Sequence, residues 1–189
     1  MNSVAAQAQR KKIHPHKFSM WVAIGSIVMM FAGLTSAYIV KREQPNWTSF
    51  DMPRIFWYST LVMLLSSVAI QWALKSFRDR EMTRYRGLVV TTLLLGMVFI
   101  LMQWLGFRQI WDSGVKLEGS GAAQFLYIIF GLHALHVFGG IVALVLMFVR
   151  AFNRKYRSYN AVPVEIAATY WHFVDLLWVY LFVFFLWIQ

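Results

Sequence analysis

The sequence predicts an all-α membrane protein with five transmembrane helices, and three observations support this fold class. Of its 189 residues, 59% are hydrophobic and only 14% are charged, whereas about a quarter of the residues in a soluble domain are charged. The apolar residues gather in blocks of roughly 20 residues, the helix length that crosses a bilayer. The basic residues gather in the linkers between the blocks, so membrane topology explains the net charge of +10 without a nucleic-acid partner.

The apolar blocks contain few polar side chains. The first block has no charged residue, and in the second the notable polar groups are hydroxyls and Gln71. The third contains Gln103, an amide that we expect to bond across helices. The fourth is long for one crossing, so we expect it to tilt or to extend beyond the bilayer. The predicted spans are residues 18–40, 55–74, 88–107, 122–149 and 165–188.

The linkers predict the orientation. The N-terminal tail, the second–third linker and the fourth–fifth linker together hold 13 of the 18 Lys and Arg residues, and the other two linkers hold 5. Basic residues are enriched on the cytoplasmic side of bacterial membranes. We therefore expect residues 1–17 to form a cytoplasmic tail and Gln189 to lie in the periplasm.

The linkers are short and the chain has no cysteine, and both facts narrow the possible functions. No linker exceeds about 16 residues, so we expect one membrane domain over residues 1–189 with no extramembrane active site. The absence of cysteine excludes disulfides, thiolate metal sites and haem attached through a CxxCH motif.

The last block, EIAATYWHFVDLLWVYLFVFFLWIQ, carries ionisable residues inside an apolar, aromatic helix. Successive residues turn by about 100°, so Glu165 and His172 lie about 20° apart and Asp175 lies about 60° from His172. A charged group deep in a bilayer costs at least about 2.5 kcal/mol on insertion scales. The stripe formed by these three residues is therefore expected to face protein rather than lipid.

The fourth block contains GLHALHVFGG, in which His133 and His136 share one helix face. Together with Glu165, His172 and Asp175 they form a candidate polar network on two consecutive helices. The favoured interpretation is a set of hydrogen bonds that holds these helices together. A metal or haem site and a proton relay are the alternatives, since imidazoles and carboxylates serve both. The Glu-x-x-His motifs of di-iron bundles are absent from the sequence.

Glycines in the first and fourth blocks, and basic residues after the fourth block, predict helix packing and lipid contact. Small residues let transmembrane helices approach closely, so we expect close packing at Gly25 and Gly33 and at Gly131, Gly139 and Gly140. The basic cluster after the fourth block lies where anionic lipid headgroups are found. Its lipid-headgroup candidates are Arg150, Arg154 and Lys155.

Two motifs together resemble the cytochrome c oxidase subunit III family of the haem–copper oxidases. In that family the last span carries a Glu followed by Tyr-Trp-His-Phe-Val-Asp, matched here by Glu165 and residues 170–175. The preceding span carries Gly-x-His-x-x-His-Val, matched from Gly131 to Val137. The resemblance covers nearly the whole chain and is of the five-span bacterial type. The family has acidic residues at two positions that are not acidic in this chain, where they correspond to Ile27 and to about Gly106. A proton role that depends on the first of these acidic residues is therefore not expected here.

The resemblance implies an accessory subunit of a proton-pumping terminal oxidase in a bacterial inner membrane. Such a subunit carries no haem or copper, which belong to partner subunits, and it has no catalytic residue. It packs beside oxidase subunit I, binds phospholipid, protects the oxidase during turnover and shares a complex with subunit II, with further respiratory complexes as possible partners. The alternatives are a subunit of a quinol oxidase or nitric oxide reductase, a small proton-coupled transporter, and a metal- or haem-binding membrane enzyme.

Overall fold

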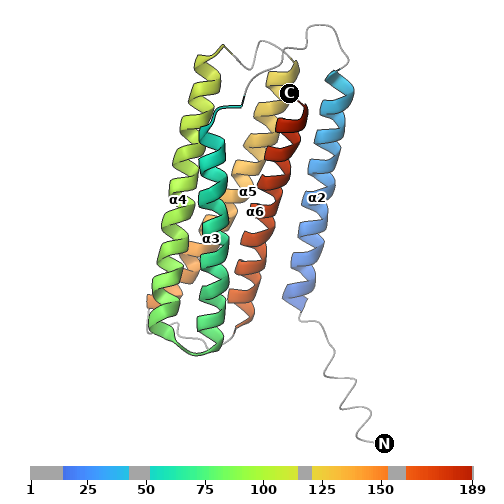
Figure 1. The fold of residues 1–189 in the computed structure, drawn as a ribbon. Coiled ribbons are helices and arrows are strands. Elements are labelled where there is room, and N and C mark those ends of the chain that lie inside the picture. Colours follow the sequence, from blue (N-terminus) through green and yellow to red (C-terminus); the bar gives the residue numbers. More distant parts are fainter. Residues whose placement is uncertain (1–14, 43–51, 115–120, 153–160, 189) are drawn as a thin grey trace, which may run out of the picture.

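Five long helices make up the computed structural model, which describes residues 15–42, 52–114, 121–152 and 161–188 (Figure 1). They are α2 (Pro15–Arg42), α3 (Ile55–Arg78), α4 (Met82–Asp112), α5 (Gly121–Phe152) and α6 (Val162–Ile188). Each is long and apolar enough to cross a membrane. The prediction of an all-α protein with five spans is confirmed.

The helices extend beyond the apolar blocks from which they were predicted. Helix α4 has 31 residues and α5 has 32, so each is about 47 Å long at 1.5 Å per residue. The hydrocarbon core of a bilayer is only about 30 Å thick. The extra turns carry basic residues such as Arg86 and Arg150, which are typical of helix ends that reach the headgroup region.

Helix α6 occupies the centre of the bundle. In its apolar stretch 56% of the residues are buried, against 22 to 33% in the other helices. It packs against α2, α3 and α5. Helices α3 and α4 form a hairpin, while α2 approaches only α5 and α6 among the described helices and stands apart from that hairpin (Figure 1).

The indole of Trp171, on α6, fills a space that two glycines leave open. A Cβ atom on Gly96 of α4 or on Gly140 of α5 would lie 3.0 Å from the ring. The Tyr170 hydroxyl lies 3.4 Å from the Cβ position of Gly139. The structure therefore confirms close packing at Gly140 and adds Gly96, which the sequence did not single out, whereas Gly139 makes only an ordinary van der Waals contact.

The other predicted close-packing glycines do not serve that purpose. Among the described residues, a Cβ atom on Gly25, Gly33 or Gly131 would meet nothing within 4 Å, so the expectation is wrong for packing within this part of the chain. Gly106 is tightly packed instead, because its Cβ position lies 2.8 Å from the Phe56 ring. The second acidic position that the family resemblance implies falls at about this residue, and Gly106 itself has no room for a carboxylate side chain.

Basic side chains from four helices gather at one end of the bundle. Lys17 lies at the start of α2, Arg78 at the end of α3, Arg86 at the start of α4 and Arg150 at the end of α5. Arg86 donates a 2.8 Å hydrogen bond to the carbonyl of Ala151, one of the last residues of α5. This end is the one that the distribution of basic residues predicts to be cytoplasmic.

Candidate functional site

Three hydroxyl groups of α3 bind two neighbouring helices. Each hydroxyl donates its hydrogen to a backbone carbonyl of its own helix, which leaves its oxygen free to accept a second hydrogen bond. The cross-helix bonds, all 3.0 Å long, run from Trp171 Nε1 to Ser66, from Trp178 Nε1 to Thr60 and from Gln103 Nε2 to Ser59. The expected cross-helix bond of Gln103 is thus present, and its partner is α3.

His172 also faces α3. Its Nε2 donates to Gln71 Oε1 at 3.1 Å, so the hydrogen of the neutral imidazole is on Nε2. Its Nδ1 then accepts from the Ser67 hydroxyl at 2.5 Å. Both ring nitrogens of His172 are satisfied by a single neighbouring helix. The predicted pairing with the fourth-span histidines is not found among the described hydrogen bonds, because the face of α6 that carries His172 is turned toward α3.

Asp175 lies one turn further along the same face and is 3% exposed. The Ser67 hydroxyl is near enough to its carboxyl to interact with it as a hydrogen-bond donor. Neither carboxyl oxygen has a hydrogen-bond partner in the described part of the chain, however. Since the Ser67 hydrogen is directed to His172, Asp175 is a buried carboxyl without a donor of its own.

The two histidines of α5 differ in their surroundings. His136 Nδ1 lies 2.7 Å from the Leu132 carbonyl of the preceding turn, and the His136 carbonyl accepts the Tyr170 hydroxyl of α6 at 3.1 Å. His133 is 3% exposed and stacks obliquely on Trp178, with ring centroids 5.4 Å apart. Neither ring nitrogen of His133 has a hydrogen-bond partner among the described residues.

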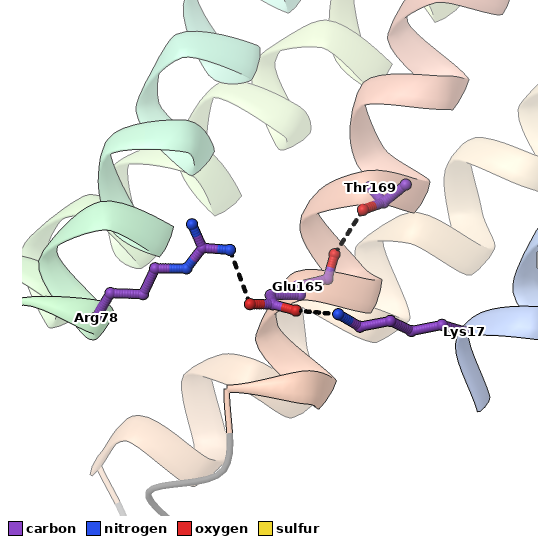
Figure 2. A network of polar contacts seen from close by, with 4 residues as sticks. All are labelled: Lys17, Arg78, Glu165 and Thr169. Carbon is purple, nitrogen blue, oxygen red and sulfur yellow. Dashed lines mark hydrogen bonds and ion pairs between the residues drawn. The ribbon is translucent and has the colours of Figure 1, made fainter. Parts of the chain in front are cut away.

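Glu165 joins three helices at the basic end of the bundle (Figure 2). Its carboxylate lies 2.5 Å from Lys17 Nζ of α2 and 2.7 Å from Arg78 Nη2 of α3, one cation at each oxygen. Glu165 is also in the first turn of α6, where a negative charge interacts favourably with the helix dipole. The sequence indicated that Glu165 would need partners, but it did not identify Lys17 and Arg78.

The five predicted polar residues therefore do not form one network through the described hydrogen bonds. Glu165 binds α2 and α3, His172 binds α3, and His136 bonds within its own helix. His133 and Asp175 are buried without hydrogen bonds to the described residues. Over the described ranges, no group of three or more His, Cys, Asp or Glu side chains is placed to hold a metal ion.

Of the three lipid-headgroup candidates, Arg150 is exposed near the end of α5, and Arg154 and Lys155 lie outside the described residues. The same end of the bundle has a cavity of about 600 Å3 where α3 meets α4, which the sequence did not reveal. Its lining has two cationic side chains, Lys75 and Arg84, and two acidic ones, Asp79 and Glu81, and Trp72 supplies an apolar wall. Arg84 is paired with Glu81 at 2.9 Å. Its residues are separated by the turn between the two helices, so no single motif marks them.

These features define a polytopic membrane protein whose polar side chains mostly join its own helices. The sequence profile described as cytochrome c oxidase subunit III matches residues 14–189. The chain therefore belongs to the cytochrome c oxidase subunit III family, and it is a multi-pass bacterial membrane protein. Membership of this family implies a complex with other oxidase subunits.

Bacterial relatives cover most of the chain. A probable cytochrome c oxidase subunit 3 of Mycobacterium tuberculosis strain H37Rv is 30% identical over an alignment of 182 residues, and the match covers 90% of each chain. The cytochrome c oxidase subunit 3 of Bacillus sp. strain PS3 is 29% identical over 170 residues, 86% of this chain and 80% of the relative. That of Bacillus subtilis strain 168 is 27% identical over 171 residues, with 86% and 81% covered.

Proposed function

We propose that this chain is a cofactor-free, non-catalytic subunit III of a haem–copper terminal oxidase that reduces oxygen to water and pumps protons. It binds the catalytic subunit I directly in a complex with subunit II, and it stabilises subunit I during turnover. The relatives named above are cytochrome c oxidase subunits, which favours cytochrome c oxidase over the quinol oxidase and nitric oxide reductase alternatives.

The way in which the polar side chains are used carries this proposal. Within the described spans, the hydroxyls of Ser59, Thr60, Ser66 and Ser67 on α3 each bond to a side chain of α4 or α6, so these polar groups hold helices together. A proton relay needs a continuous series of ionisable groups. Here His172 bonds to α3, while His133 and Asp175 are unbonded in the described structure. The arrangement supports a packing role better than a transport pathway.

The outer surface supports association with a membrane partner. Large apolar side chains are exposed along the helices, including Trp21 and Met29 on α2 and Leu135 and Phe138 on α5. Such residues can face lipid or another transmembrane subunit. A subunit that joins a larger complex needs a surface of this kind.

We also propose that this chain binds phospholipid, and the basic end of the bundle supports this. Arg150 is exposed there, and Lys75 lies beside Trp72 in the lining of the 600 Å3 cavity, which also contains the Arg84–Glu81 ion pair and Asp79. A cation beside an interfacial indole suits a lipid phosphate with its glycerol backbone. We propose that a phospholipid headgroup binds at this basic end of the bundle.

A mild-detergent purification through a tag on this chain tests the proposal. We expect a large polytopic partner to co-purify, with haem and copper in the optical spectrum and the metal analysis. Both should stay with the partner when this chain is stripped away. Metal bound to the isolated chain would instead support a metal-binding enzyme. Proton-coupled transport by the chain alone in vesicles would support a transporter.

A further inference from the structure

The cavity of about 600 Å3 between α3 and α4 has charged side chains of both signs in its lining. It lies next to the turn that joins the two helices, and this turn is at the end of the bundle where α2 begins (Figure 1). Two cationic and two acidic side chains contribute to the lining, so their charges cancel. A purely anionic ligand would therefore meet two carboxylates as well as two cations.

The lining side chains are arranged in layers along the hairpin. Because α3 and α4 run in opposite directions from one turn, residues at equal distances from that turn lie at similar depths. From the turn inward, the layers are acidic (Asp79 and Glu81), basic (Lys75 and Arg84) and apolar (Trp72 and Leu88). At 1.5 Å per residue, each layer lies roughly 5–6 Å deeper than the one before it.

The charges of the acidic and basic layers are only partly used within the protein. Arg84 Nη1 and Glu81 Oε2 form a 2.9 Å ion pair, but these side chains are 76% and 48% exposed, so the pair contributes little stability. Lys75 and Asp79 are exposed and four residues apart, yet neither forms an ion pair with another described residue. A ligand can therefore reach a cation and a carboxylate at two different depths.

We propose that this cavity binds a zwitterionic phospholipid headgroup whose cation is a primary ammonium. In such a headgroup the ammonium lies outermost, the phosphate next and the glycerol deepest, which is the order of the layers. The ammonium donates to Asp79 and Glu81 in the acidic layer. The phosphate accepts from Lys75 and Arg84 in the basic layer. The glycerol backbone lies against the indole of Trp72.

Two other headgroup classes match the lining less well. An anionic glycerol headgroup has no cation, so its negative charge would face the acidic layer unscreened. A choline headgroup carries both charges, but its quaternary nitrogen has no N–H to donate to Asp79 or Glu81. The inference rests on the phospholipid binding proposed above and adds which headgroup the site prefers.

Native mass spectrometry of the full chain in mild detergent tests this preference. The chain is titrated with phosphatidylethanolamine, its N,N-dimethyl derivative and phosphatidylcholine, all with the same acyl chains. These three lipids have the same net charge, so other basic surfaces of the chain attract them equally. We expect phosphatidylethanolamine to bind about two- to fivefold more tightly than phosphatidylcholine, the effect of a partly exposed charged pair, with the dimethyl derivative between them.

Two pairs of variants locate the effect. Asp79→Asn should remove the preference for phosphatidylethanolamine, whereas Asp112→Asn, at the opposite end of α4, should keep it. Lys75→Gln should weaken the binding of all three lipids about two- to fivefold, and Lys41→Gln, near the end of α2, should not. All four side chains are exposed, so we expect these variants to fold, and their melting temperatures check this.

The outcomes separate this inference from the proposal on which it rests. Equal binding of phosphatidylethanolamine and phosphatidylcholine by the unaltered chain would overturn the inference, and so would a preference that Asp79→Asn retains. In both cases a phospholipid is still bound, so the proposed phospholipid binding would stand. A chain that binds none of the three lipids would contradict both. Whether an oxidase partner co-purifies is decided by the separate purification described above.

Discussion

The indole nitrogen of Trp171, on α6, donates a 3.0 Å hydrogen bond to the hydroxyl of Ser66, on α3. Ser66 in turn donates its own hydrogen to the Met63 carbonyl at 2.9 Å. The Trp171 ring is fully buried, with Gly96 of α4 and Gly140 of α5 against it. One side chain thus brings the central helix into contact with three others, by one hydrogen bond and two close approaches.

Removing the acceptor of this bond should destabilise the bundle. In Ser66→Ala the Trp171 N–H loses its partner in an apolar surrounding, and we expect a loss of about 1 kcal/mol in unfolding free energy. Thermal denaturation in detergent, followed by circular dichroism, measures the effect. Ser26→Ala is the control, because Ser26 is exposed on α2 and bonds only to its own helix. Equal melting temperatures of the two variants would contradict a role for the Trp171–Ser66 bond.

Adding a methyl group at Gly140 should cost more than adding one at Gly131. The new Cβ atom would lie 3.0 Å from the rigid Trp171 ring, and overpacking of this kind costs about 1–3 kcal/mol. Gly131→Ala meets nothing within 4 Å and gains helix propensity, so it should be neutral or slightly stabilising. The comparison uses the same melting experiment. A Gly140→Ala variant as stable as Gly131→Ala would show that the ring can move aside.

Neutralising Glu165 should loosen α2 from the rest of the bundle. Glu165→Gln weakens the contacts with Lys17 and Arg78, whose side chains are partly exposed, so we expect a loss of only about 1 kcal/mol. The difference should shrink at high salt, which screens partly exposed pairs. Glu81→Gln is the matched control, because the described partner of Glu81 is Arg84, three residues away on the α3–α4 hairpin. Faster protease cleavage near the start of α2 in Glu165→Gln alone would locate the effect.

The buried carboxyl of Asp175 should contribute little to stability. Both of its oxygens lack hydrogen bonds to the described residues, so Asp175→Asn removes no such bond and keeps the side-chain shape. We expect the melting temperature to stay the same or to rise. His172→Phe, which breaks the bonds to Ser67 and Gln71, should lower it. A marked loss of stability in Asp175→Asn would reveal a partner for this carboxyl.

The sequence was sufficient for the fold but not for the pairing of polar groups. Block length and hydropathy determine the five spans, because a bilayer imposes both on any helix that crosses it. The hydrogen-bond partners of His172 depend on how α6 is rotated about its axis relative to α3. A single sequence does not specify that rotation. Gly96 and Gly106 were missed for the same reason, since the indole and phenyl rings packed against them come from other helices.

The central claim, that this chain supports a catalytic partner without taking part in its chemistry, is tested most directly during turnover. The measurement is oxygen consumption by the purified oxidase with this chain present and with it removed, followed from the first seconds until activity is lost. We predict that the initial rate per haem changes little, while the oxidase that lacks this chain inactivates several times sooner. Loss of the initial rate itself, or equal lifetimes of the two preparations, would contradict the account.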